Sequence, residues 1–188
     1  PVVTADAPEQ LLMSQSFQFG YGVGEAPLTS WILSLFNFAP GLSPILFFGV
    51  KYALLAFGVI MAYRAALHLF GRIDEEGIER TRYDLAALST LAWGATYYGG
   101  WAWHQQDAIQ PIVLFATLSL SLHALTHALG RGNILSFAYF GFAAGLGALA
   151  DYRHVIFTIS ALLAANSIRA LRAVSRNEDG SIAQNPTL

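Results

Sequence analysis

The chain has 188 residues, of which 55% are hydrophobic and only 12% are charged, and its formal net charge is −2. A soluble domain carries roughly 25% charged residues, so this composition indicates an integral membrane protein and excludes a disordered chain. Ten Lys and Arg residues leave no basic patch for nucleic acid, and the absence of cysteine excludes disulfides, thiolate chemistry and cysteine metal sites.

Residues 1–43 form an N-terminal segment without a clear crossing. Polar side chains interrupt residues 11–24, residues 31–39 are too short to span a bilayer, and several prolines exclude one straight helix. We expect an extracytoplasmic interfacial helix or half of a re-entrant loop. A sixth span made by residues 9–24 is the alternative. A cleaved secretory signal is not expected, because no Lys or Arg precedes the first apolar run.

Residues 44–174 contain the apolar stretches that predict the fold class. A span needs about 20 apolar residues to cross a core of roughly 30 Å. Five stretches meet or approach this length: residues 44–70, 85–103, 111–129, 134–150 and 155–174. The prediction is an all-α, polytopic integral membrane bundle of five transmembrane helices. Polar residues at 130–133 and 151–154 predict tight turns around the fourth span, and residues 175–188 predict a flexible cytoplasmic tail.

The distribution of arginine predicts the orientation of the bundle. With five spans, eight of the nine arginines lie on one side of the membrane. They are Arg64, Arg72, Arg80, Arg82, Arg131, Arg169, Arg172 and Arg176. Positive charge is retained in the cytoplasm, so we expect the N-terminus outside and the C-terminus inside.

Four polar residues gather on the predicted outer side and form a first candidate site. His104 and Asp107 are three residues apart, as are Asp151 and His154, and this spacing places each pair on one face of a helix end. Imidazole and carboxylate groups together suit a divalent metal site or a proton relay. The alternative is that the two aspartates cap helices at the interface, where a carboxylate favours the N-terminal dipole.

Three histidines on the predicted inner side form a second candidate site. His123 and His127 are four residues apart and share a helix face, while His68 lies near the inner end of the first span. Intramembrane histidines usually point into the bundle, because a polar ring facing lipid is unfavourable. The three rings are candidates for binding haem or a metal ion. Hydrogen bonds between helices are the alternative explanation.

Lys51 lies about 10 Å into the first span and needs a compensating group. The predicted partner is Glu25, with a structural ion pair as one reading and a proton or ion pathway as the other.

The fourth span contains a pattern of small residues, with Gly141 and Gly145 four positions apart. Such a pattern lets another helix approach closely and predicts a packing surface. The partner helix can belong to this chain or to another.

Residues 20–28 read Gly-Tyr-Gly-Val-Gly-Glu-Ala-Pro-Leu, and an apolar helix bearing Lys51 follows. This stretch resembles a family of small prokaryotic polytopic membrane proteins of uncharacterised activity, whose segment is Gly-x-x-Glu-Ala-Asn-Pro-Leu. The asparagine is missing here. The resemblance implies no activity, but it supports contact between Glu25 and Lys51.

These features favour a non-catalytic integral membrane subunit that packs within a larger membrane assembly. Its expected partners are the lipid bilayer and other membrane subunits or a second copy, but not nucleic acid. Two alternatives remain open: a haem- or metal-binding membrane protein in electron transfer, and a small transporter or channel.

Overall fold

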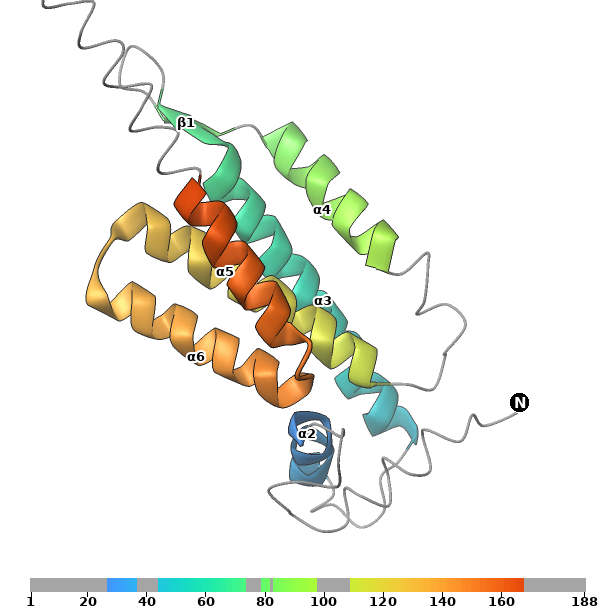
Figure 1. The fold of residues 1–188 in the computed structure, drawn as a ribbon. Helices are drawn as coiled ribbons and strands as arrows, with labels where there is room; N and C mark the ends of the chain where they lie inside the picture. The colour runs from blue at the N-terminus through green and yellow to red at the C-terminus, as the bar shows by residue number, and fades with distance from the viewer. Residues whose placement is uncertain (1–26, 37–43, 74–78, 82, 98–108, 168–188) are drawn as a thin grey trace, which may run out of the picture. The chain divides into compact units, whose positions relative to one another are not determined.

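The computed structural model describes residues 27–36, 44–73, 79–81, 83–97 and 109–167, drawn in colour in Figure 1. Its contacts divide the chain into two units, Pro1–Val155 and Ile156–Leu188, which are described separately. The first unit contains the elements α2 (Leu28–Phe36), α3 (Pro44–Phe70), β1 (Gly71–Ile73), β2 (Glu79–Thr81), α4 (Tyr83–Tyr97), α5 (Gln110–Arg131) and α6 (Ile134–Ala150). A further helix, His154–Ser167, begins at the end of this unit and continues into the second.

The described residues are helical apart from one short β-hairpin, which the all-α prediction did not include. Strands β1 and β2 pair antiparallel, with Arg72 opposite Arg80. Both strands lie in the polar connection between α3 and α4.

Two helices, Phe47–Phe70 and Gln110–Arg131, are long and apolar enough to cross a membrane by length and composition. The helices Ile134–Ala150 and His154–Ser167 are apolar but shorter. Helix α2 has nine residues and is about 14 Å long, too short to span. The five-span bundle is therefore supported only in its coarse form, as an apolar helical bundle. Residues 9–24, the predicted sixth span, lie outside the described residues.

The connection between α5 and α6 is the tight turn that the sequence predicts. Gly132 ends α5 in a left-handed conformation, with φ 66°, and its N–H donates to the Ala128 carbonyl at 2.9 Å. Asn133 then caps α6, because its side chain accepts a hydrogen bond from the Ser136 amide at 2.8 Å. Both ends of the turn are satisfied locally, so α5 and α6 form a helical hairpin.

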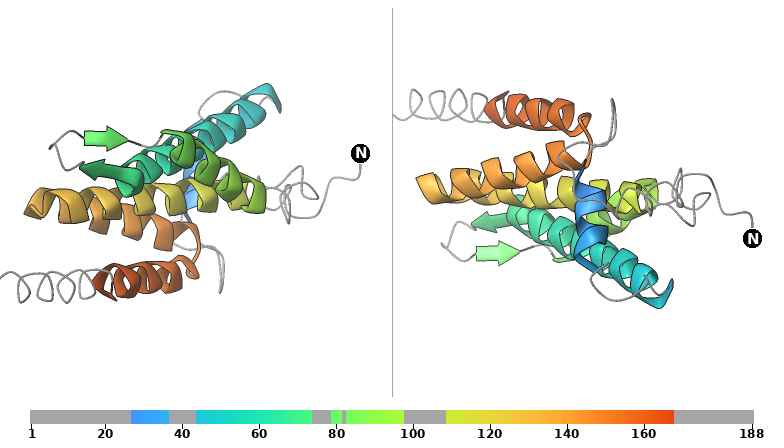
Figure 2. Two further views of the ribbon diagram at one scale, coloured as in Figure 1. Left: turned by 90° about the horizontal axis from the view of Figure 1, so that it is seen from above. Right: turned by 90° about the horizontal axis from the view of Figure 1, so that it is seen from below.

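Helix α5 is the central element of the first unit. It packs against both α3 and α6, and it lies between them in both views of Figure 2. In its most apolar window 72% of the residues are buried, against 22% for α3. Near the N-terminal end of α5, one cluster of buried side chains joins four helices. Its members are Leu33, Val50, Ile109, Val113 and Ala150.

Candidate functional site

The three predicted inner histidines come together at the C-terminal ends of α3 and α5. His123 and His127 are one helical turn apart on α5, and their ring centroids are 6.0 Å apart. His68, in the last turn of α3, stacks on His123 with centroids 5.5 Å apart and meets His127 edge to face at 5.7 Å. We call these three side chains the histidine cluster.

Tyr139 on α6 forms one side of the histidine cluster, a position that the sequence does not predict. Its ring centroid is 6.2 Å from that of His123 and 6.5 Å from that of His127, both edge to face. Tyr139 faces the histidines because of how α6 is rotated about its own axis. That rotation is set by the packing of α6 on α5 and cannot be read from the sequence alone.

His123 is the most enclosed member of the cluster. Its side chain is 8% exposed, and its Nδ1 atom is buried without a hydrogen-bond partner among the described residues. His127 is half-buried and His68 is exposed. The cluster thus runs from a buried, unsatisfied nitrogen to an exposed ring.

The arrangement of the rings is unfavourable for haem. Two axial histidines must point a nitrogen at the iron from opposite faces of the porphyrin, whereas His68 and His123 stack directly on each other. Haem would require α3 and α5 to separate. In the described part of the chain, no three His, Asp or Glu side chains are already arranged to hold a metal ion.

Of the four predicted outer residues, two are described. His154 is 1% exposed, and its Nε2 shares a hydrogen bond of 3.3 Å with Ser121 Oγ on α5. Asp151 ends α6, and its Oδ1 accepts a hydrogen bond from the Arg153 amide at 2.8 Å. Both side chains are thus used in packing and in a turn. His104 and Asp107 lie outside the described residues, so a metal site shared by all four stays a prediction.

Burial determines the electrostatics of His154, which precedes the predicted span 155–174. Removal from water lowers the pKa of His154 below its ordinary value, while the charge of Asp151 acts more weakly in the opposite direction. Burial thus favours the uncharged form of the ring, and the serine hydroxyl can donate to or accept from Nε2, depending on the ring tautomer.

The two glycines predicted to pack against a helix have open surroundings. A Cβ built at Gly141 or Gly145 would meet no atom within 4 Å. The close approaches are elsewhere: a Cβ at Gly147 would overlap the His154 ring, and one at Gly58 on α3 would lie 2.6 Å from the Phe115 ring. Gly147 belongs to the buried stripe of α6, with Ser136, Phe140, Ala143 and Ala150.

Lys51 is buried on α3, at 7% exposure, beside the core residue Val50. Its predicted partner Glu25 lies outside the described residues, so the ion pair stays a prediction.

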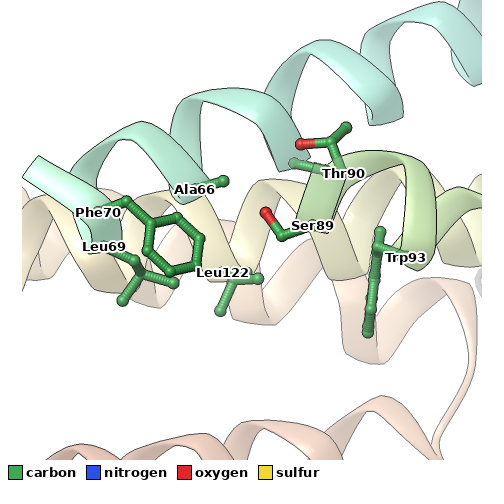
Figure 3. Close-up of a pocket in the computed structure, with 8 residues that line it drawn as sticks. Ala66, Leu69, Phe70, Ser89, Thr90, Trp93 and Leu122 are labelled. Carbon is green, nitrogen blue, oxygen red and sulfur yellow. The ribbon is translucent and has the colours of Figure 1, made fainter. Parts of the chain in front are cut away.

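A small apolar cavity of about 180 Å³ lies between α3, α4 and α5 (Figure 3). Leu69, Trp93 and Leu122 are among the residues that line it. The hydroxyls of Ser89 and Thr90 in its wall donate to the Ala86 carbonyl, at 3.0 and 2.7 Å. The cavity therefore presents hydrocarbon rather than free polar groups, and it offers no chemistry for a polar substrate.

No family model, curated protein or solved structure matches this chain.

Proposed function

We propose that this protein is a non-catalytic integral membrane subunit, whose helical bundle packs within a larger membrane assembly. The observation that carries the proposal is the exposure of α3. The apolar segment Phe47–Phe70 has 24 residues. Of its most apolar 18 residues, only 22% are buried. The core helix of a soluble protein would be mostly covered, whereas a helix in lipid needs no such cover.

Large apolar side chains on other helices point outward in the same way. Leu88 and Leu91 on α4 are 65% and 70% exposed, and Phe142 on α6 is 64% exposed. Many large apolar side chains exposed on several helices are unusual for a soluble monomer and are expected where the surroundings are lipid or a partner.

Polar side chains are found inside the bundle. Helix α5 buries Thr117, Ser119, Ser121 and Thr126. Thr117 and Thr126 donate to carbonyls of their own helix, and Ser119 accepts a hydrogen bond of 3.4 Å from Trp93 on α4. Buried polar groups with internal partners beneath an apolar exterior are expected where the surroundings are lipid. These hydroxyls therefore make hydrogen bonds within the bundle.

The open glycine surface of α6 supports the assembly part of the proposal. Gly141 and Gly145 lie one turn apart with nothing within 4 Å of either built Cβ. Small residues let two backbones approach in a membrane, where packing rather than hydrophobic burial drives association. A helix from another subunit or a second copy would fit this surface. The arginine distribution supports an orientation with the C-terminus in the cytoplasm.

Photo-crosslinking in the native membrane tests the proposal. A photoreactive residue replaces Gly145 in one variant and Ile60, an outward residue of α3 at 54% exposure, in the control. We expect a discrete protein adduct from position 145 and lipid adducts from position 60. Lipid adducts alone from both positions, with the protein migrating as a monomer, would contradict assembly through this surface.

A further inference from the structure

We propose that the cavity between α3, α4 and α5 holds one acyl chain of a zwitterionic phospholipid, and that Arg72 and Arg80 bind the phosphate of the same lipid. This inference rests on the membrane part of the proposed function, because the lipid comes from the surrounding bilayer. It goes beyond that function by assigning a ligand of stated chemistry and the residues that hold it.

The lining of the cavity suits hydrocarbon. The cavity has a volume of about 180 Å³, and its lining residues are apolar except for Ser89 and Thr90. These two hydroxyls donate to the Ala86 carbonyl, so their hydrogens are already used within α4. An apolar cavity of about 150 Å³ stays dry and binds small hydrocarbons. Part of an acyl chain is therefore a more favourable occupant than water.

The cavity reaches the apolar surface of the bundle. Leu69, which belongs to its lining, is 58% exposed. Leu88 and Leu91 adjoin the lining residues of α4 in the sequence, and they are 65% and 70% exposed. In a bilayer, such side chains contact lipid tails rather than water. An acyl chain can therefore enter the cavity from the lipid without passing a polar surface.

The position of the cavity along α3 matches one leaflet of a bilayer. Its lining on this helix runs from Ala62 to Phe70, which is the last residue of α3. Eight residues of helix correspond to about 12 Å. One half of a hydrocarbon core of roughly 30 Å is about 15 Å thick. A chain in the cavity would thus lie at the depth of the tails of that leaflet, with its headgroup beyond Phe70.

Two arginines are paired at this end of the cavity. Strand β1 begins at Gly71, directly after Phe70, and Arg72 is the Cα partner of Arg80 across the hairpin. Like charges directly opposite each other in an antiparallel pair are destabilising. An anionic group bound by both residues relieves this repulsion. Phosphate is a preferred anion for arginine, because the guanidinium group can donate two hydrogen bonds to it.

The other charges of the connection indicate the class of headgroup. Residues 71–82 contain four acidic and three basic residues. Glu79 is the Cα partner of Ile73, and successive residues of a strand alternate between its two faces. Glu79 therefore belongs to the face of the hairpin opposite to that of Arg72 and Arg80. A headgroup that carries both a phosphate and an ammonium group suits this mixed connection better than one with a net negative charge.

Quenching of Trp93 fluorescence by brominated lipid tests the proposal. The full chain with Trp31→Phe, Trp101→Phe and Trp103→Phe keeps Trp93 as its one tryptophan. The Trp93 ring lines the cavity, and its Nε1 donates to Ser119 Oγ at 3.4 Å (Figure 3). Phosphatidylcholine with brominated acyl chains is added to this chain in detergent micelles. We expect quenching that saturates at one lipid per chain.

Diacylglycerol with the same brominated chains tests the phosphate contact, because it lacks the phosphate. It should require a concentration about fivefold or more above that of phosphatidylcholine, on the scale of one arginine at a lipid headgroup. Arg72→Gln combined with Arg80→Gln should remove this difference between the two lipids. Arg131→Gln is the matched control, since it removes an exposed arginine at the end of α5, and it should retain the difference.

Filling the cavity tests the acyl-chain site. Ser89→Leu places bulk in the cavity and should abolish the saturable quenching. Ala87→Leu adds similar bulk at an exposed position of α4 and should leave the quenching unchanged. Circular dichroism reports whether each variant is folded. If Ser89→Leu does not fold, Leu69→Trp in the unaltered tryptophan background fills the cavity from an exposed position, and native mass spectrometry should show loss of the bound phosphatidylcholine.

Three results would overturn the inference. Quenching that rises without saturation, or that is equal in Ser89→Leu and Ala87→Leu, would mean that Trp93 contacts only the lipid belt around the bundle. Equal responses to phosphatidylcholine and diacylglycerol in the chain with both arginines would exclude the phosphate contact. Flotation of the chain with phosphatidylcholine vesicles separates these failures from failure of the proposed function. A chain that does not float overturns both, whereas one that floats without saturable quenching overturns the lipid site alone.

Discussion

The imidazole ring of His154 packs directly against the backbone of Gly147, one turn before the end of α6. The ring also shares a 3.3 Å hydrogen bond with Ser121 of α5. One buried histidine therefore connects the end of α6, the start of the following helix and the middle of α5.

Gly147→Ala should destabilise the bundle by about 1–3 kcal/mol, because the new methyl group overlaps the His154 ring and forces packed elements to move. Thermal unfolding in detergent, followed by circular dichroism, measures the effect. Gly94→Ala on α4 is the control, because Gly94 lies in a helix interior but outside the glycine surface proposed for assembly. Its surroundings are open, so it should be neutral or stabilising by up to about 1 kcal/mol. Equal losses in both variants would show that helix propensity, not contact with His154, decides the result.

Acidification should destabilise the folded chain through His154. Its folded pKa is below the ordinary value because the ring is buried. The unfolded chain therefore binds more protons in the window from the unfolded pKa of about 6.5 down to the folded pKa. The contribution of His154 to the free energy of unfolding is fully present above that pH window. It is lost as the pH falls through the window. His154→Gln should lose less stability than the unaltered chain between pH 7.5 and pH 5. Parallel pH profiles for the two proteins would contradict the assignment.

The termini should lie on opposite sides of the membrane. A reporter fused after Leu188 should be active in the cytoplasm, and a tag before Pro1 should be accessible from outside, because arginine concentrates on one predicted face. Protease protection of the tag in intact and permeabilised cells measures this. Both termini on one side would mean that residues 9–39 supply another crossing.

Lys51→Met combined with Glu25→Gln should harm stability less than either change alone. Lys51 is buried, and a lysine at the centre of a span costs about 2.5–3.5 kcal/mol unless it is compensated. Each single change would leave one charge without its partner, whereas the double change removes both. A double-mutant cycle of unfolding free energies measures the coupling. Additive losses would exclude this pair.

The composition and the spacing of residues predict the helical bundle and the histidine cluster. His123 and His127 share a face because they are one turn apart. His68 meets them from the last turn of α3, although its ring remains exposed. The turn at Gly132 and Asn133 was also predictable, since both residues are typical of helix ends.

The buried face of α6 could not be predicted from the sequence. In a soluble helix, polar residues mark the outer face, but here the outward residue Phe142 is as apolar as the buried residue Phe140. Without that contrast, Gly141 and Gly145 were as plausible at the packed surface as Gly147. Contact with α5 determines which face of α6 is buried. That contact forms only when both helices of the hairpin are in place.

The enclosure of α5 also has a consequence for biosynthesis. Helix α5 is long and apolar enough to cross a membrane by length and composition, but its buried serine, threonine and histidine side chains are accommodated better when neighbouring helices cover them than when they face lipid. Helix α6 follows after a tight turn and covers one flank, while α3 leaves the ribosome earlier and covers the other. We therefore expect α5 and α6 to enter the bilayer as one unit beside α3, and a nascent chain truncated after Gly132 to be removed by membrane proteases.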